Sequence, residues 1–176
     1  MNLVCNYSRV GDGNLDFRFG KEDEVVESRK KFLKKIGRRM ENCVMLQQVH
    51  GDGVRVVNGR DGGEMFKADA LVTKEKGVGL FLLTADCFSV VVYDSVRGIL
   101  ALAHLGWQGV DKGLMVKVIE KMIKMGSDLV NLEARIGPGI RKESYVFDVP
   151  LIQENDSRWQ PFLERQSGGK TAIDLV

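Results

Sequence analysis

Short apolar segments follow one another closely in the middle of the sequence. They span residues 70–73 (ALVT), 79–85 (GLFLLTA), 89–94 (SVVVYD) and 98–104 (GILALAH). Each is short, rich in aliphatic or β-branched residues, and bounded by Gly or Asp, which is typical of strands buried on both faces. The sequence therefore predicts a sheet at the centre of the molecule.

Two stretches with helical periodicity flank this region. Residues 22–36 place Phe32, Leu33 and Ile36 at helical spacing, and Gly37 follows as a stop. Residues 113–125 carry a second apolar stripe, which Gly126 ends. Together with the strands, these helices predict a mixed α/β fold with a predominantly β centre.

Shorter elements complete the expected chain. Residues 43–49 and 54–57 predict two strands joined by a turn at 51–53, and hence a hairpin with His50 at its corner. Weaker signals predict strands at 132–138 and 145–149, loops at 1–20 (with at most a short strand at 3–7) and 58–64, and one more element at 172–175. A length of 176 residues fits one domain with a single core, spanning residues 1–176.

The charge balance and the length of the apolar segments give no reason to expect a nucleic-acid or membrane partner. Lys and Arg number 26 against 24 Asp and Glu, and a net charge of +2 gives no reason to expect nucleic acid as a partner. The basic run at 28–39 has apolar residues at helical spacing, so it predicts the solvated face of a helix rather than an RNA or membrane patch. No apolar stretch reaches the roughly 20 residues that span a bilayer.

The three cysteines bear on the cellular compartment. Cys5, Cys43 and Cys87 are an odd number and widely separated, so a disulfide framework is not expected. The first ten residues also lack the basic and then apolar layout of a signal peptide. We therefore expect a cytoplasmic protein without membrane contact.

Three residues with soft, reactive side chains stand at the ends of predicted strands: His50, Cys87 and His104. They include both histidines of the chain. One thiolate and two imidazoles suit zinc with a fourth position open, as in catalytic zinc sites. Alternatively, Cys87 is a nucleophile with His104 as its base and Asp86 or His50 as the orienting group. A buried thiol beside a core histidine is the third interpretation, and spacing alone leaves all three open.

Other candidates carry weaker signals. Trp107 lies between glycines in HLGWQG and is either a stacking surface for a flat ring or a core residue. The loop IGPGIRKES, with Arg141, is either an anion site or a plain turn. Asp69, Asp86 and Asp94 are interpreted as strand-end caps and turn formers, and Asp86 is also a candidate for orienting a metal ligand.

Five ordered motifs carry a family resemblance. QQVHGDGVRVV, ADALVT, TADC, AHLGWQG and IGPGI…YVFDV occur in this order and cover nearly the whole chain. The sequence thus resembles the family once labelled multicopper polyphenol oxidases or laccase-domain proteins, now regarded as zinc-dependent purine nucleoside phosphorylases that also deaminate adenosine. The resemblance implies an α-β-β-α sandwich, similar to that of the cytotoxic necrotizing factor deamidases.

The resemblance also implies roles for individual residues. By position, His50, Cys87 and His104 are the zinc ligands and the catalytic centre, with Asp86 beside them. Arg9 matches a family arginine, and Arg9, Trp107, Gln108 and Arg141 are the implied substrate-binding residues. The expected substrates are purine nucleosides and inorganic phosphate, bound by a monomer or homodimer.

The sequence departs from the family pattern at two places. Gln108 replaces the arginine of the family's GWRG motif, which removes a charge and a fork of donors from a position that could hold phosphate. The family also continues beyond the segment matching 170–176 with a helix and an arginine-bearing strand. We expect this sequence either to be a truncated form or to build the end of its site differently.

Two functions from other classes stay open beside the phosphorylase. One is a cysteine hydrolase or deamidase that uses Cys87 and His104. The other is a zinc- and nucleoside-binding protein with weakened catalysis. Multicopper oxidase chemistry is disfavoured, because several coppers need far more than two histidines.

Overall fold

The computed structural model describes residues 3–148 and 151–175. Contacts divide the chain into two compact units, Met1–Gly137 and Pro138–Val176. The single domain spanning residues 1–176 stays a prediction.

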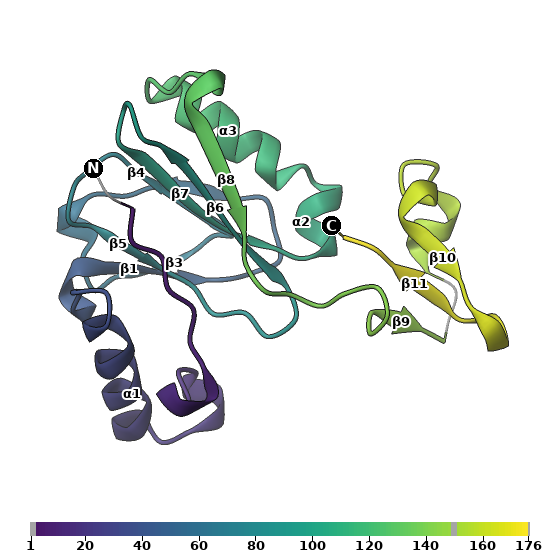
Figure 1. Cartoon of the computed structure of the whole chain (residues 1–176), viewed down its shortest axis with the longest axis horizontal. Coiled ribbons are helices and arrows are strands. Elements are labelled where there is room, and N and C mark those ends of the chain that lie inside the picture. The colour runs from purple at the N-terminus through teal and green to yellow at the C-terminus, as the bar shows by residue number, and fades with distance from the viewer. Residues whose placement is uncertain (1–2, 149–150, 176) are drawn as a thin grey trace. The chain divides into compact units, whose positions relative to one another are not determined.

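Two sheets form the centre of the first unit. The five-stranded sheet has the order β2-β4-β7-β6-β8, and the three-stranded sheet has the order β3-β1-β5. The strands are β1 (Cys43–Gln47), β2 (Val54–Val56), β3 (Met65–Lys67), β4 (Ala70–Thr73), β5 (Gly79–Phe81), β6 (Phe88–Asp94), β7 (Ile99–Leu105) and β8 (Leu132–Ile136). Both sheets pack face to face, with α1 (Glu22–Lys34) and α3 (Leu114–Lys124) on opposite sides of the pair (Figure 1). The predicted α-β-β-α layering is confirmed.

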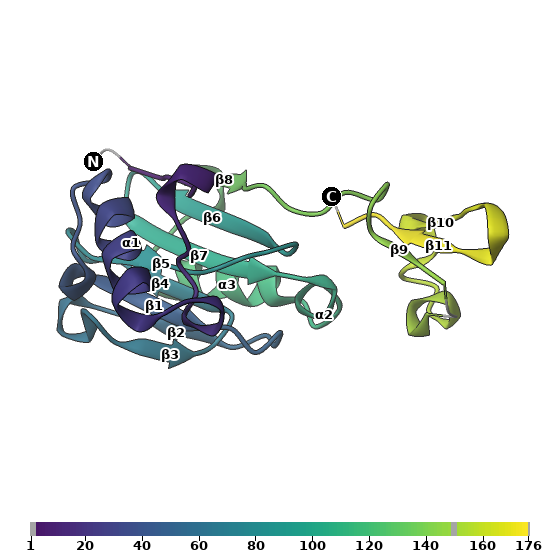
Figure 2. The same ribbon diagram turned by 90° about the horizontal axis from the view of Figure 1, so that it is seen from below.

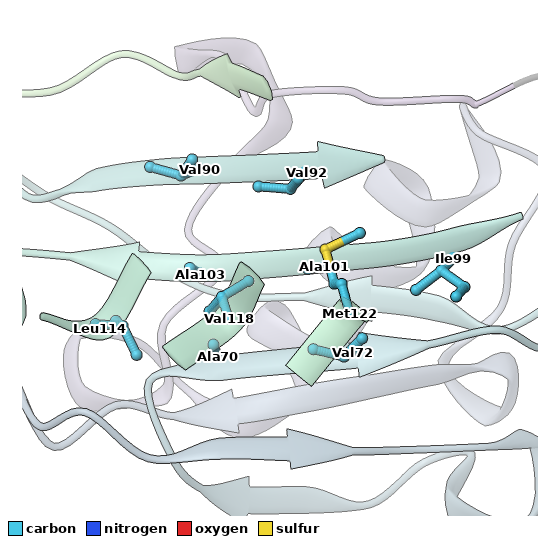
Figure 3. Close-up of a cluster of buried hydrophobic side chains, with 10 residues drawn as sticks. All are labelled: Ala70, Val72, Val90, Val92, Ile99, Ala101, Ala103, Leu114, Val118 and Met122. Carbon is cyan, nitrogen blue, oxygen red and sulfur yellow. The ribbon is translucent and has the colours of Figure 1, made fainter. Parts of the chain in front are cut away.

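Each interface between layers has its own hydrophobic cluster. The cluster between α3 and the five-stranded sheet comprises Ala70, Val72, Val90, Val92, Ile99, Ala101, Ala103, Leu114, Val118 and Met122 (Figure 3). A second cluster, between the sheets, includes Val44, Leu46 and Leu71. A third joins Phe32 and Leu33 of α1 to Cys43 and Phe81 of the three-stranded sheet, and Figure 2 shows α1 from that side. Burial on both faces explains why β6 is buried at every position.

The helices lie where the sequence predicts them. Glu22, Asp23 and Glu24 occupy the first turn of α1, where negative charge is favourable to the helix dipole. The helix ends at Lys34, and the predicted stop, Gly37, follows in the left-handed region with φ 66°. A short helix, α2 (Trp107–Asp111), precedes α3. Short 3-10 helices lie at Val10–Asp12, Phe17–Phe19, Met40–Asn42, Gly59–Asp61 and Leu129–Asn131.

The predicted hairpin at 43–57 is wrong. Strand β1 pairs in parallel with β3 and β5 of the three-stranded sheet, whereas β2 pairs in parallel with β4 of the five-stranded sheet. The chain therefore crosses from one sheet to the other at 48–53. The predicted strand at 79–85 is also shorter, because only Gly79–Phe81 pairs with β1 and the rest is loop.

The second unit contains a small antiparallel sheet of order β10-β11-β9. Its strands are β9 (Val146–Phe147), β10 (Leu163–Arg165) and β11 (Thr171–Ile173), with 3-10 helices at Ile152–Asn155, Gln160–Phe162 and Ser167–Gly169. Strand β9 lies within the predicted 145–149, of which Val149 falls outside the described residues, and β11 overlaps the predicted 172–175. Strand β10 was not predicted. Within the described parts of both units, every helix is too short or too polar to cross a membrane.

Candidate metal centre

The side chains of His50, Cys87 and His104 converge at one end of the five-stranded sheet. One donor atom from each lies within 4.8 Å of the others. The Cys87 Sγ atom is 3.9 Å from His50 Nε2, and the two imidazole rings are 4.8 Å apart between centroids, at an angle of 85°. His104 is buried, Cys87 half-buried and His50 exposed, so the group opens toward solvent on the His50 side.

Strand register brings Cys87 and His104 together. His104 in β7 lies directly opposite Ser89 in β6, and Cys87 precedes Ser89 by two residues. Because side chains alternate along a strand, Cys87, Ser89 and His104 share one face of the sheet. On the other side of β7, the His104 N–H donates to the carbonyl of Asp69, immediately before β4.

His50 reaches the same place from the crossover between the sheets. It has φ 54°, the one positive φ at a non-glycine position among the described residues. That conformation costs on the order of 1–3 kcal/mol and persists where surrounding contacts hold it.

Those contacts come largely from Asp69, whose side chain is fully buried. Its Oδ1 atom lies 2.9 Å from His104 Nδ1 and accepts from the His50 N–H at 3.0 Å. Its Oδ2 atom accepts from the Gly51 N–H at 2.7 Å. The carboxylate therefore meets the imidazole of one histidine and the backbone of the other.

Two lysines, one directly after α2 and one in α3, bond to the crossover at 48–53. The Lys112 ammonium donates to the His50 carbonyl at 3.1 Å, and the Lys117 ammonium pairs with Asp52. The Lys117 hydrogen bond lowers the pKa of the Asp52 carboxyl from its usual 3.8.

Gly106 provides room beside the three side chains. A β-carbon there would lie 2.8 Å from Cys87 Sγ and 3.6 Å from His50 Cδ2. With φ −99° its backbone suits any residue, so the requirement for glycine is one of space.

The protonation states favour ligands over an activated nucleophile. Burial lowers the pKa of His104 from its usual 6.5, against the hydrogen bond to Asp69, which raises it. Burial raises the pKa of the Cys87 thiol, and the negative charges of Asp86 and Asp69 raise it further. A neutral imidazole beside a protonated thiol is not a thiolate–imidazolium pair, whereas a bound cation would itself deprotonate the thiol.

The three side chains fit a tetrahedral cation such as zinc. With Nδ1 of the neutral ring donating to Asp69, the lone pair of His104 lies on Nε2. Tetrahedral zinc separates a thiolate sulfur from an imidazole nitrogen by about 3.5 Å, close to the 3.9 Å between Cys87 and His50. Sulfur and nitrogen donors suit zinc, and three protein ligands leave a fourth position for substrate or water.

The remaining predicted site residues belong to several segments of the chain. Asp86 is exposed next to Cys87, and Trp107 and Gln108 are half-buried at the start of α2, just beyond Gly106. Arg9 is exposed in the N-terminal loop, where its N–H donates to Asp12. Arg141 belongs to the second unit, where its carbonyl accepts from Ser144 and Tyr145. The substrate-binding roles of these residues stay predictions.

Asp69 has a role beyond the strand-end capping and turn formation predicted for it, because its carboxylate also meets His104. The predicted turn-forming role fits its bonds to the His50 and Gly51 N–H groups. It also fits Asp94, whose Oδ1 accepts from the Val96 and Arg97 N–H groups. The available signal was an acidic residue directly before a wholly buried strand, since a buried carboxylate needs several donors.

The layered sheets and the His–Cys–His group define a mixed α/β protein with a candidate metal centre at a sheet end. The chain belongs to the family described as multi-copper polyphenol oxidoreductase laccase, whose family model matches residues 7–176.

Named relatives match over most of this chain. A protein of Deinococcus radiodurans named purine nucleoside phosphorylase is 34% identical over 165 residues, which are 93% of this chain and 63% of the relative. A protein from an unknown prokaryotic organism, named adenosine deaminase RL5, is 31% identical over 81% of this chain and 53% of its own length. The chain thus spans less than two thirds of these relatives.

The fold also matches a solved structure. YlmD from Geobacillus stearothermophilus superposes with a TM-score of 0.82 at 26% identity, over 92% of this chain and 65% of that protein.

Proposed function

We propose that this chain is a zinc-dependent purine nucleoside phosphorylase with adenosine deaminase as a side activity. The observation that carries the proposal is the convergence of both histidines with Cys87 around a space suited to one tetrahedral cation. The names of the relatives supply the substrate class. The copper chemistry in the family's description is disfavoured here, because the chain has only two histidines.

His50, Cys87 and His104 would hold the ion, with Asp69 orienting His104. When bound, the ion supplies positive charge that polarises a substrate oxygen or an attacking water. Trp107, next to Gly106, offers an aromatic face for the purine. Arg9 is the proposed phosphate contact, and Gln108 offers only a neutral amide in this role.

Phosphorolysis would convert adenosine, inosine or guanosine to the free base and ribose 1-phosphate. A phosphate oxygen attacks C1′, the glycosidic bond breaks, and the purine leaves with the bonding electron pair and takes up a proton. Deamination would add water at C6 of adenosine and release ammonia. Both reactions need a site that orders the purine and excludes bulk water.

The test is release of hypoxanthine from inosine, with and without phosphate, before and after treatment with a chelator. We expect phosphate-dependent turnover that the chelator abolishes and added zinc restores. A cysteine hydrolase would instead resist the chelator and be inactivated by alkylation of Cys87. Zinc and nucleoside binding without turnover would identify a binding protein, and that result overturns the proposed catalysis.

A further inference from the structure

Asp69 is the buried group that links two of the three candidate ligands. Its Oδ1 atom meets both the Nδ1 atom of His104 and the N–H of His50, and its Oδ2 atom takes the Gly51 N–H. The N–H of Val49 also points to it, at 3.3 Å. Loss of this carboxylate would release an imidazole and a backbone turn at the same time.

Lys112 holds the same turn from its other side. Asp69 fixes the N–H of His50, and the Lys112 ammonium fixes the His50 carbonyl at 3.1 Å. Both amide groups that flank the His50 α-carbon are therefore bonded. This matters because the positive φ of His50 is one that non-glycine residues leave when nothing holds them.

We propose that Asp69 and Lys112 are positioning residues of the metal centre and that together they preorganise His50 and His104 for the ion. Asp69 directs Nε2 of His104 into the centre and holds the N–H side of His50, while Lys112 holds its carbonyl side. Neither residue needs to touch the ion. The inference rests on the proposed function only in requiring that the three side chains bind a metal.

The proposal predicts a specific pattern of metal affinity. Orienting partners of metal ligands typically contribute about 10- to 100-fold in affinity. Asp69→Asn should lose about that much, because an amide cannot accept from His104, His50 and Gly51 as both carboxylate oxygens do. Lys112→Met should lose less, about 10-fold, and Lys112→Arg should restore most of it, because a guanidinium can still donate to the His50 carbonyl.

The experiment measures zinc affinity of the full chain by chelator competition, and the absorption spectrum of the cobalt(II)-loaded chain, without any substrate. The matched control is Asp94→Asn, another fully buried carboxylate that caps a turn at the opposite end of β6 from Cys87. It should cost thermal stability but leave the zinc affinity and the cobalt spectrum unchanged. Asp69→Asn should weaken zinc binding and change the cobalt spectrum, because the geometry around the ion changes.

An Asp69→Asn variant that binds zinc as tightly as wild type, with the same cobalt spectrum, overturns the proposal. If Asp69→Asn does not fold, the test rests on Lys112, whose side chain is exposed. A zinc affinity of Lys112→Met equal to that of wild type then overturns the proposal. A wild-type chain that binds neither ion also overturns it. If wild type binds zinc with the predicted pattern but turns over no nucleoside, the proposed function fails while the positioning role stands.

Discussion

Gly106 lies where the backbone comes closest to two of the candidate ligands. A β-carbon there would lie 2.8 Å from Cys87 Sγ, which no relaxed structure tolerates. We expect Gly106→Ala to push the thiol aside and weaken zinc binding by about 10-fold or more, as loss of ligand positioning does. Chelator competition on the purified variant measures the effect.

Gly109 is the matched control, since it is a buried glycine three residues later. A β-carbon at Gly109 meets its nearest neighbours, in Leu105 and Leu114, at an ordinary 3.5 Å. Zinc affinity should therefore be unchanged in Gly109→Ala. Equal affinities in the two variants would show that the space beside Gly106 does not matter to the centre.

A sequence identifies chemically distinctive residues more readily than it identifies their partners. His50, Cys87 and His104 could be singled out because two histidines and a thiol are rare and chemically distinctive. Asp69 could not be given its role in the same way, since its partners lie 19 and 35 positions away. Aspartates before strands are common caps, and only strand pairing shows which of them faces a histidine.

The packing of β1 against α1 can be tested through Cys43, the first residue of β1. This thiol is buried between α1 and the three-stranded sheet, and burial raises its pKa from the usual 9.0 to about 11. The unfolded chain therefore loses this proton at lower pH than the folded chain does. Stability from this group is complete below pH 9 and falls as the pH rises from 9 to about 11, by about 1.4 kcal/mol per pH unit.

Denaturant unfolding at pH 8, 9, 10 and 11 measures this decline. We expect Cys43→Ala to be less stable at pH 8, because it leaves a cavity, but to lose about 2 to 3 kcal/mol less than wild type between pH 9 and 11. Parallel curves for wild type and Cys43→Ala would contradict this assignment.

Element types were predictable where the pattern is local. The helices at Glu22–Lys34 and Leu114–Lys124 and the buried strands β4, β6 and β7 follow from periodicity and glycine stops. The hairpin failed because β1 and β2 have the strand–turn–strand spacing of a hairpin but pair with β5 and β4, respectively, in different sheets. Pairing partners are set by packing between layers, which sequence spacing does not encode.

All three candidate ligands lie in the first unit, Met1–Gly137. The α-β-β-α layering explains the site, because the centre forms where the crossover from the three-stranded sheet meets the end of the five-stranded sheet. The layering was expected from the family resemblance, whereas composition and periodicity indicated only a mixed α/β fold with a β centre.

The most direct test of the metal centre is elemental analysis of the purified full chain, wild type and Cys87→Ala, each assayed for phosphate-dependent base release from inosine. We expect about one zinc per wild-type chain, and in Cys87→Ala a loss of most of the zinc together with the activity. The proposed centre would be contradicted if wild-type protein contained no zinc and Cys87→Ala were as active as wild type.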